Sequence, residues 1–490
     1  MYAILKFDVE DVYYPPEYRI DDIPGWLARI MTEEGLRGTF CVTGEKARTM
    51  KDRGRNDVLE AMAAHDIFSH TQGNVRPLIP EILQDKGWDD GVEAMLAYEA
   101  KAAADIRYAF GRDPAGFSRH NCYTGAQHVA AAARLGLPYL EAIAWAGQNR
   151  QPLWYAGAFS LNTPNDPMFG GFDTIYTCDA AFEAQLAKLR PFIAECAAQN
   201  VEFVTLFGCH PVRVMAHGWL EHYTLGGGIT RTPREVGWLY ALKPRELEEV
   251  AKANFRRLCK AIKALDGLKL IGAVEAAKLF STRPGTICRD ELAAYGQQLD
   301  QAQEPVLHTT FSPAELVVGF AESLLYAEEH GDLPYETIRR DVLGPKTRPV
   351  TGRQADLVTH EQLVAMSREL VDHVMAEGHL PGNLRLDGLL VGLGQYAVAA
   401  GRSYAALARY EKYARLRILD TARYPAQAMR IDNWIRHCVQ EHRPYGPDFT
   451  CEKLAEHARL QAWTIKPAWL HPPRGPAGGD ARIWPWRPKA

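Results

Sequence analysis

The 490-residue chain lacks the sequence features of disulfide-stabilised, membrane-spanning and nucleic-acid-binding proteins. Its nine cysteines are odd in number, scattered and free of any Cys-x-x-Cys pair, a pattern that favours reduced thiols over a disulfide framework. No apolar run approaches the ~20 residues that a membrane-spanning helix requires. With a formal net charge of −4, the chain also has no excess of basic residues for nucleic acid or an anionic membrane.

The N-terminus likewise lacks the basic segment and apolar core of a secretory leader, because a strand-like run begins at once. Together with the cysteine pattern, this predicts a cytoplasmic protein. Hydrophobic residues make up 47% and charged residues 24% of the chain, which is ordinary for a globular protein, so a sizeable core is expected. The length predicts two or three domains.

Residues 1–285 alternate between short apolar runs typical of strands and longer stretches with helical periodicity. Such alternation is typical of parallel sheets and barrels in which helices connect successive strands, so we expect an α/β domain here. The predicted strands are residues 3–7, 37–43, 201–207 and 268–271, and the predicted helices are residues 23–34, 91–110, 126–135 and 181–200.

A second part of the chain, residues 286–466, is expected to form a mostly helical module with a two-copy repeat. Each copy opens with a capping box, beginning at Ser312 and at Thr359, and each ends in Gly-x-Leu-Pro, with an offset of 47 residues. The spacing and the Leu-Pro endings resemble the pseudomurein-binding-type repeats of cell-surface proteins. Residues 467–490, rich in Pro, Gly and Trp, are predicted to be an extended tail.

The first strand-like run of the chain ends in three carboxylates, Asp8, Glu10 and Asp11. Catalytic groups collect at the carboxyl ends of parallel strands, and neighbouring carboxylates repel one another unless a metal ion or a shared proton offsets the repulsion. In an extended strand Asp8 and Glu10 point the same way, whereas Asp11 points across the strand. The run therefore predicts either a functional site at the edge of the sheet or an acidic turn exposed to solvent.

Four stretches of the first domain occur in an informative order: Phe7-Asp-Val-Glu-Asp11, Gly38-Thr-Phe-Cys-Val-Thr-Gly44, His65-Asp-Ile-Phe-Ser-His-Thr71 and Leu206-Phe-Gly-Cys-His-Pro211. On these residues, the third stretch above all, the chain resembles the polysaccharide deacetylase superfamily of metal-dependent amide and ester hydrolases. The resemblance covers residues 1–285. It implies a distorted (β/α) barrel with one zinc or similar divalent ion on an Asp-His-His triad.

The resemblance assigns His70 to the first metal-binding histidine, with a loop histidine that caps the next segment as the alternative, whereas His65 is predicted to be structural. Imidazole and carboxylate are suitable ligands for an ion that activates water and polarises a carbonyl. Where the family has its second histidine this chain has Asn74, and an amide oxygen is a poor zinc ligand. Either Asn74 binds the ion weakly, another side chain such as His120 or a motif carboxylate completes the site, or the metal is absent.

The carboxylates take different roles under the resemblance. Asp8 is expected to be the general base, which is suited to accept a proton if it makes no metal bond of its own. The metal carboxylate is either Glu10 or Asp11. Strand geometry prefers Glu10, but Asp11 is favoured because family patterns more often use Asp.

The resemblance also assigns two basic side chains. His210 is expected to protonate the leaving amine, with a histidine that only packs or faces solvent as the alternative. Arg119 lies in an altered third motif, Gly116-Phe-Ser-Arg-His120, where it is expected either to pair with Asp8 or to be an exposed loop residue.

Two functions follow from these assignments. The first is a metal-dependent hydrolase that removes an acyl group from an N-acylated sugar or related small amide. The second is a catalytically silent protein that binds glycans, which the change to Asn74 and the altered third motif favour. Aromatic residues beyond His210, namely Trp219, Tyr223 and Trp238, are expected either to line a substrate cleft or to belong to the core.

Overall fold

The computed structural model describes residues 1–73, 77–120, 125–142, 152–161, 168–217, 242–352, 357–425, 448–471 and 483–484. Asn74 and the aromatic residues Trp219, Tyr223 and Trp238 lie outside these ranges. None of the helices within them is both long enough and apolar enough to cross a bilayer.

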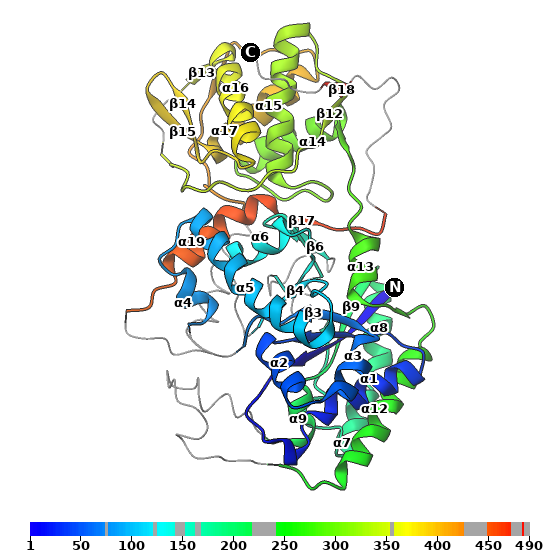
Figure 1. The fold of residues 1–490 in the computed structure, drawn as a ribbon. Helices are drawn as coiled ribbons and strands as arrows, with labels where there is room; N and C mark the ends of the chain where they lie inside the picture. The colour runs from blue at the N-terminus through cyan, green and yellow to red at the C-terminus, as the bar shows by residue number, and fades with distance from the viewer. Residues whose placement is uncertain are drawn as a thin grey trace. The chain divides into compact units, whose positions relative to one another are not determined.

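The chain divides into two compact units (Figure 1). The first contains residues 1–152, 158–281 and 434–453, and the second contains residues 153–157, 282–433 and 454–490. Each unit thus takes a segment from a distant part of the chain, and each has its own cluster of buried apolar side chains.

A sheet of parallel strands forms the core of the first unit and curls into a partial barrel. Its strand order is β7-β5-β4-β3-β2-β1-β9-β8, and the short β10 also pairs with β1. The strands are β1 (Tyr2–Val9), β2 (Thr39–Val42), β3 (Asp66–Ser69), β4 (Phe117–Ser118), β5 (Tyr139–Leu140), β7 (Ala158–Ser160), β8 (Met168–Phe169), β9 (Phe203–Cys209) and β10 (Lys269–Leu270). The predicted α/β class with a barrel-like sheet is confirmed.

Strand β1 is buried along nearly its whole length, from Ala3 to Val9, which explains its almost continuous apolar sequence. It is flanked by β9 on one side, and β2 and β10 also pair with it in parallel. The register places Asp8 beside Cys41 of β2. Because these strands are parallel, the residues that follow them meet at one edge of the sheet.

Helices connect and cover these strands. They include α1 (Asp22–Glu33), α2 (Gly44–Asp52), α3 (Asn56–Ala63), α5 (Trp88–Phe110), α6 (Ala126–Arg134), α9 (Pro211–Met215), α12 (Leu247–Lys263) and α13 (Ala273–Phe280). The apolar faces of α1 and α12 bury Trp26 and Phe255, whose rings meet edge to face beside Phe7 of β1. The sheet and these helices therefore share one core.

One predicted helix is wrong in extent. Residues 181–200 do not form a single helix but parts of two, α7 (Asp179–Leu186) and α8 (Leu189–Ala198). The break has a local cause, because Pro191 has no backbone N–H and its ring would clash with the carbonyl of Ala187 in a continuous helix. Pro191 is tolerated in the first turn of α8, where helical N–H groups have no partner within the helix.

The second unit is rich in helices, as predicted for the C-terminal part of the chain (Figure 1). Its main helices are α14 (Arg289–Ala302), α15 (Pro313–His330), α16 (His360–Glu377) and α17 (Leu393–Leu407). Short strands pair between them: β11 (Thr286–Cys288) with β12 (Glu336–Ile338), β13 (Leu357–Thr359) with β16 (Arg415–Arg417), and β14 (Asn383–Leu386) with β15 (Leu389–Gly392).

The two copies of the repeat begin and end as their sequences indicate. Ser312 Oγ accepts a hydrogen bond from the Glu315 backbone N–H at 3.2 Å, and Glu315 Oε2 accepts one from the Ser312 N–H at 2.9 Å. Thr359 forms the same capping box at the start of α16. Helices α15 and α16 end at Gly331 and Gly378, whose φ angles of 80° and 68° favour glycine.

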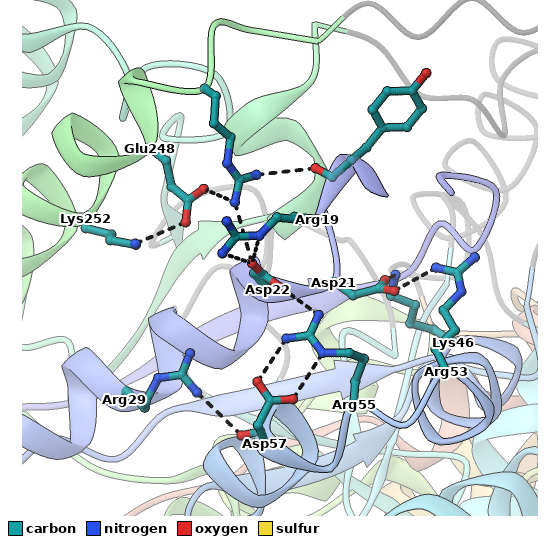
Figure 2. A network of polar contacts seen from close by, with 12 residues as sticks. Arg19, Asp21, Asp22, Arg29, Lys46, Arg53, Arg55, Asp57, Glu248 and Lys252 are labelled. Carbon is teal, nitrogen blue, oxygen red and sulfur yellow. Dashed lines mark hydrogen bonds and ion pairs between the residues drawn. The ribbon is translucent and has the colours of Figure 1, made fainter. Parts of the chain in front are cut away.

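A network of charged side chains connects α1, α2, α3 and α12 in the first unit (Figure 2). Within it, Asp21 accepts hydrogen bonds from Lys46 Nζ at 2.5 Å and from Arg53 at 2.7 Å. Lys46 Nζ also donates to the backbone carbonyl of Asp11 at 2.9 Å, so the network reaches the turn that follows β1. Burial alone raises the pKa of Asp21, but Lys46 and Arg53 outweigh burial and lower that pKa to about 2.

Replacing Asp21 with Asn should lower the free energy of unfolding by about 2 kcal/mol at pH 7, because the unfolded-state pKa lies near 3.8. The depressed pKa stabilises the fold above about pH 4, and this contribution is lost as the pH falls towards 2. The stability difference between wild type and Asp21→Asn, followed by chemical denaturation, should therefore shrink below pH 4. The more exposed Asp57→Asn, from the same network, is the control and should change stability much less.

Candidate metal and catalytic site

The edge formed by the carboxyl ends of the parallel strands brings together residues that are far apart in the sequence. Asp8 and Glu10 come from the end of β1 and Cys41 from β2. Residues that follow β3, β4, β5 and β9 complete the set: His70, Arg119, His120, Glu141 and His210. The sheet topology therefore places almost every described candidate residue on a single edge.

Three of these residues could hold a metal ion. The candidate ligand atoms of Glu10, His70 and His120 all lie within 4.8 Å of one another, and all three residues are buried. His70 Nε2 is 3.8 Å from Glu10 Oε2, and His120 Nε2 is 2.6 Å from the same oxygen. Glu10 Oε2 thus lies near an imidazole nitrogen of both histidines.

Hydroxyl groups orient both imidazole rings. His70 Nδ1 contacts Ser118 Oγ at 2.6 Å, and His120 Nδ1 contacts Thr71 Oγ1 at 3.2 Å. With Nδ1 engaged in this way, Nε2 of each ring faces Glu10. Contacts of this kind set the ring orientation and tautomer of metal-binding histidines.

The donor set fits zinc or a similar divalent ion. Two imidazoles and one carboxylate leave room for water or substrate, which is the composition of many catalytic zinc sites. Burial, followed by the nearby charge of His120, holds the pKa of His70 well below its usual value. His70 is thus a neutral imidazole with a lone pair available for a metal.

Asp11 lies outside this cluster. Its backbone is left-handed, with φ of 61°, and its Oδ1 accepts a hydrogen bond from the Tyr13 N–H at 3.1 Å. Between the two carboxylates that the sequence left open, the geometry therefore favours Glu10 as the metal ligand.

Asp8 lies next to the cluster but has a cation of its own. Lys6 Nζ is 3.1 Å from Asp8 Oδ1 and 3.1 Å from Glu141 Oε2. Burial raises the pKa of Asp8 despite the opposing effects of Lys6 and His210. Glu141 behaves differently, because Lys6 and Arg119 outweigh its burial and lower its pKa to about 2. Of the two carboxylates that share Lys6, Asp8 is the better proton acceptor.

Arg119, which the sequence offered as a partner for Asp8, instead pairs with Glu141 at 3.3 Å. The charges alternate in sign along the series Arg119, Glu141, Lys6 and Asp8. Within the described residues, Arg119 is therefore connected to Asp8 through Glu141 and Lys6.

His210 lies on the other side of Asp8. Its Nε2 is 3.8 Å from Asp8 Oδ2, and its Nδ1 is 3.0 Å from Asp173 Oδ2. Asp173 also accepts a hydrogen bond from the His210 backbone N–H at 2.8 Å. Burial lowers the pKa of His210, but Asp173, Glu10 and Asp8 together outweigh burial and raise that pKa overall, which favours the protonated imidazolium.

Sequence reasoning did not identify Lys6, Glu141 or Asp173. The sequence could have predicted Lys6 as a site residue, because it alternates with Asp8 and Glu10 along β1 and therefore shares their side of the strand. No sequence pattern predicts Glu141 or Asp173 as site residues, since their positions depend on how distant strands are arranged. His65, predicted to be structural, accepts a hydrogen bond from the Gly38 N–H at 3.1 Å.

No protein-family model and no curated protein matches the chain. Among solved structures, a family 4 carbohydrate esterase from Streptomyces lividans in complex with acetate is 15% identical, covering 55% of this chain and 91% of that chain, with a TM-score of 0.29. A family 4 acetyl xylan esterase from Clostridium thermocellum in complex with a cobalt ion is 12% identical, covering 58% and 93%, with a TM-score of 0.30. Puue allantoinase is 12% identical, covering 56% and 89%, with a TM-score of 0.35.

The geometry predicts different consequences for the two carboxylates that end β1. Glu10→Gln should weaken zinc binding by about 10-fold or more, because it removes an anionic oxygen from the ligand cluster. Asp11→Asn, the matched control, should bind zinc as wild type does. Calorimetric titration of the metal-free proteins measures both, and equal losses in the two variants would contradict this assignment.

Proposed function

We propose that this chain is a metal-dependent hydrolase that removes an acyl group from an N-acylated sugar or a related small amide. The observation that carries the proposal is the convergence of a ligand cluster, a proton acceptor and a proton donor. Asp8 lies between them, with Oδ1 3.9 Å from His70 Nε2 and Oδ2 3.8 Å from His210 Nε2. Hydrolysis of an amide needs all three functions.

Glu10, His70 and His120 would hold the ion, which when bound lowers the pKa of a water molecule and polarises the substrate carbonyl. The Asp8 carboxylate accepts the proton of the attacking water, and Lys6 keeps that carboxylate in place. His210 Nε2 then donates a proton to the departing nitrogen. Asp173, hydrogen-bonded to His210 Nδ1, holds the imidazole in the orientation that this step requires.

The carbohydrate part of the proposal rests on the sequence motifs that resemble polysaccharide deacetylases. Asp8, His70 and His210 occupy the motif positions, and their side chains lie on one edge of the sheet. Among the described residues, His120 supplies a second imidazole to the cluster. The change at Asn74 is therefore compatible with metal binding, which weakens one reason for the glycan-binding alternative.

The roles of Asp8 and His210 can be separated by substrate. Asp8→Asn should lower the rate by about 10²- to 10⁴-fold on amides and esters alike while zinc remains bound. His210→Ala should slow amide hydrolysis more than hydrolysis of activated esters, whose leaving groups need no proton. Steady-state rates on matched amide and ester substrates measure the loss in each case. Equal losses of rate on both in His210→Ala would show that His210 is not the general acid.

The proposal as a whole is tested with wild-type protein loaded with zinc, cobalt or nickel. Release of acetate from N-acetylated sugars or simple acetyl esters supports it. Absence of turnover on all of these substrates, combined with measurable binding of glycans, would favour the catalytically silent alternative.

A further inference from the structure

A second group of metal-binding residues adjoins the first. The candidate ligand atoms of Asp8, Cys41 and His70 lie within 4.8 Å of one another, and all three residues are buried. His70 belongs to this group and to the Glu10 cluster, so the two groups share a ligand. Because the Nε2 atom of His70 has one lone pair, an ion in one group would compete for it with an ion in the other. The thiol of Cys41 would suit a soft ion such as zinc or cobalt.

The ammonium group of Lys6 already lies beside this second group, where a metal ion would bind. Lys6 Nζ is 3.1 Å from Asp8 Oδ1, and the Lys6 side chain is 2% exposed. Asp8 is also the β1 partner of Cys41 in the strand register, whereas Lys6 pairs with Thr39. The thiol and the ammonium interact electrostatically.

Lys6 cannot readily leave this position. Glu141 holds its ammonium from the other side at 3.1 Å, and Arg119 pairs with Glu141 in turn. The ring of Phe207 lies 5.7 Å from Lys6 Nζ and adds a cation–π contact. A divalent ion bound by Asp8 and Cys41 would therefore meet a fixed positive charge in a buried setting, where repulsion between like charges is strong.

We propose that Lys6 serves as the built-in cation of the Asp8–Cys41–His70 group and excludes a second metal ion from it. As a result, His70 binds an ion only together with the Glu10 cluster. Asp8 does not bind a metal ion and remains a proton acceptor. Lys6 is a positioning residue in this scheme. The inference rests on the proposed function only in that the first ion occupies the Glu10 cluster.

The experiment is a titration of the metal-free protein with cobalt(II) under anaerobic conditions. Equilibrium dialysis counts the bound ions, and near-ultraviolet absorption detects a bond between cobalt and a thiolate. Wild type should bind about one ion without a thiolate band. Lys6→Met should show the band, because an ion held by Asp8 and Cys41 can then compete with the Glu10 cluster for His70 Nε2. Lys6→Met/Cys41→Ser should lose the band, which assigns it to Cys41.

Two variants separate charge from general disturbance of the strand. Lys6→Arg keeps the positive charge and should behave as wild type does. Lys269→Met removes an exposed lysine from β10, the neighbour of β1, and should also leave the count at about one. If Lys6→Met does not fold by circular dichroism, Lys6→Met/Glu141→Gln, which removes one charge of each sign, takes its place.

The outcomes are distinguishable. A thiolate band or a second ion in wild type overturns the inference, and so does a single ion without a band in folded Lys6→Met or its double variant. If wild type binds no cobalt while Lys6→Met gains a thiolate-bound ion, the proposed function fails and the assignment of Lys6 stands.

Discussion

Buried negative charge at the carboxyl end of β1 is the constraint on which the site depends. Asp8, Glu10 and Asp11 are each less than a tenth exposed, and an unpartnered buried carboxylate costs several kcal/mol. Each is compensated in a different way: Asp8 by Lys6, Glu10 by His120, and Asp11 by a backbone N–H. The three carboxylates therefore have different electrostatic environments although they lie within residues 8–11 of the chain.

The charged contacts that stabilise the end of β1 continue into the surrounding helices. The backbone carbonyl of Asp11 is held by Lys46, and Lys46 is held by Asp21 within the network of Figure 2. Because this network joins helices from distant parts of the first unit, the turn that presents Glu10 is secured by the packing of those helices. Stability of the fold and geometry of the ligand cluster are coupled through buried charges.

The sequence was sufficient for features that depend on local pattern. Apolar runs predicted β1, and capping boxes predicted the starts of α15 and α16, because these features depend on residues a few positions apart. It was insufficient where strand register decides the outcome, as in the pairing of Arg119 with Glu141 and the approach of His120 to Glu10. The broken helix at Pro191 was a misread local signal, since proline alone argues against residues 181–200 as one helix.

The pairing of Arg119 with Glu141 follows from the same charge arrangement. A lysine two residues before Asp8 on the same side of β1 already neutralises it, so an arginine at position 119 finds Glu141 as its partner. Asp8 is therefore supported by Lys6 although Arg119 pairs with Glu141. The same lysine lies where a cation would bind between Asp8 and Cys41. Lys6 thus joins two features of the site, because it neutralises Asp8 and places a positive charge where an ion would compete for His70.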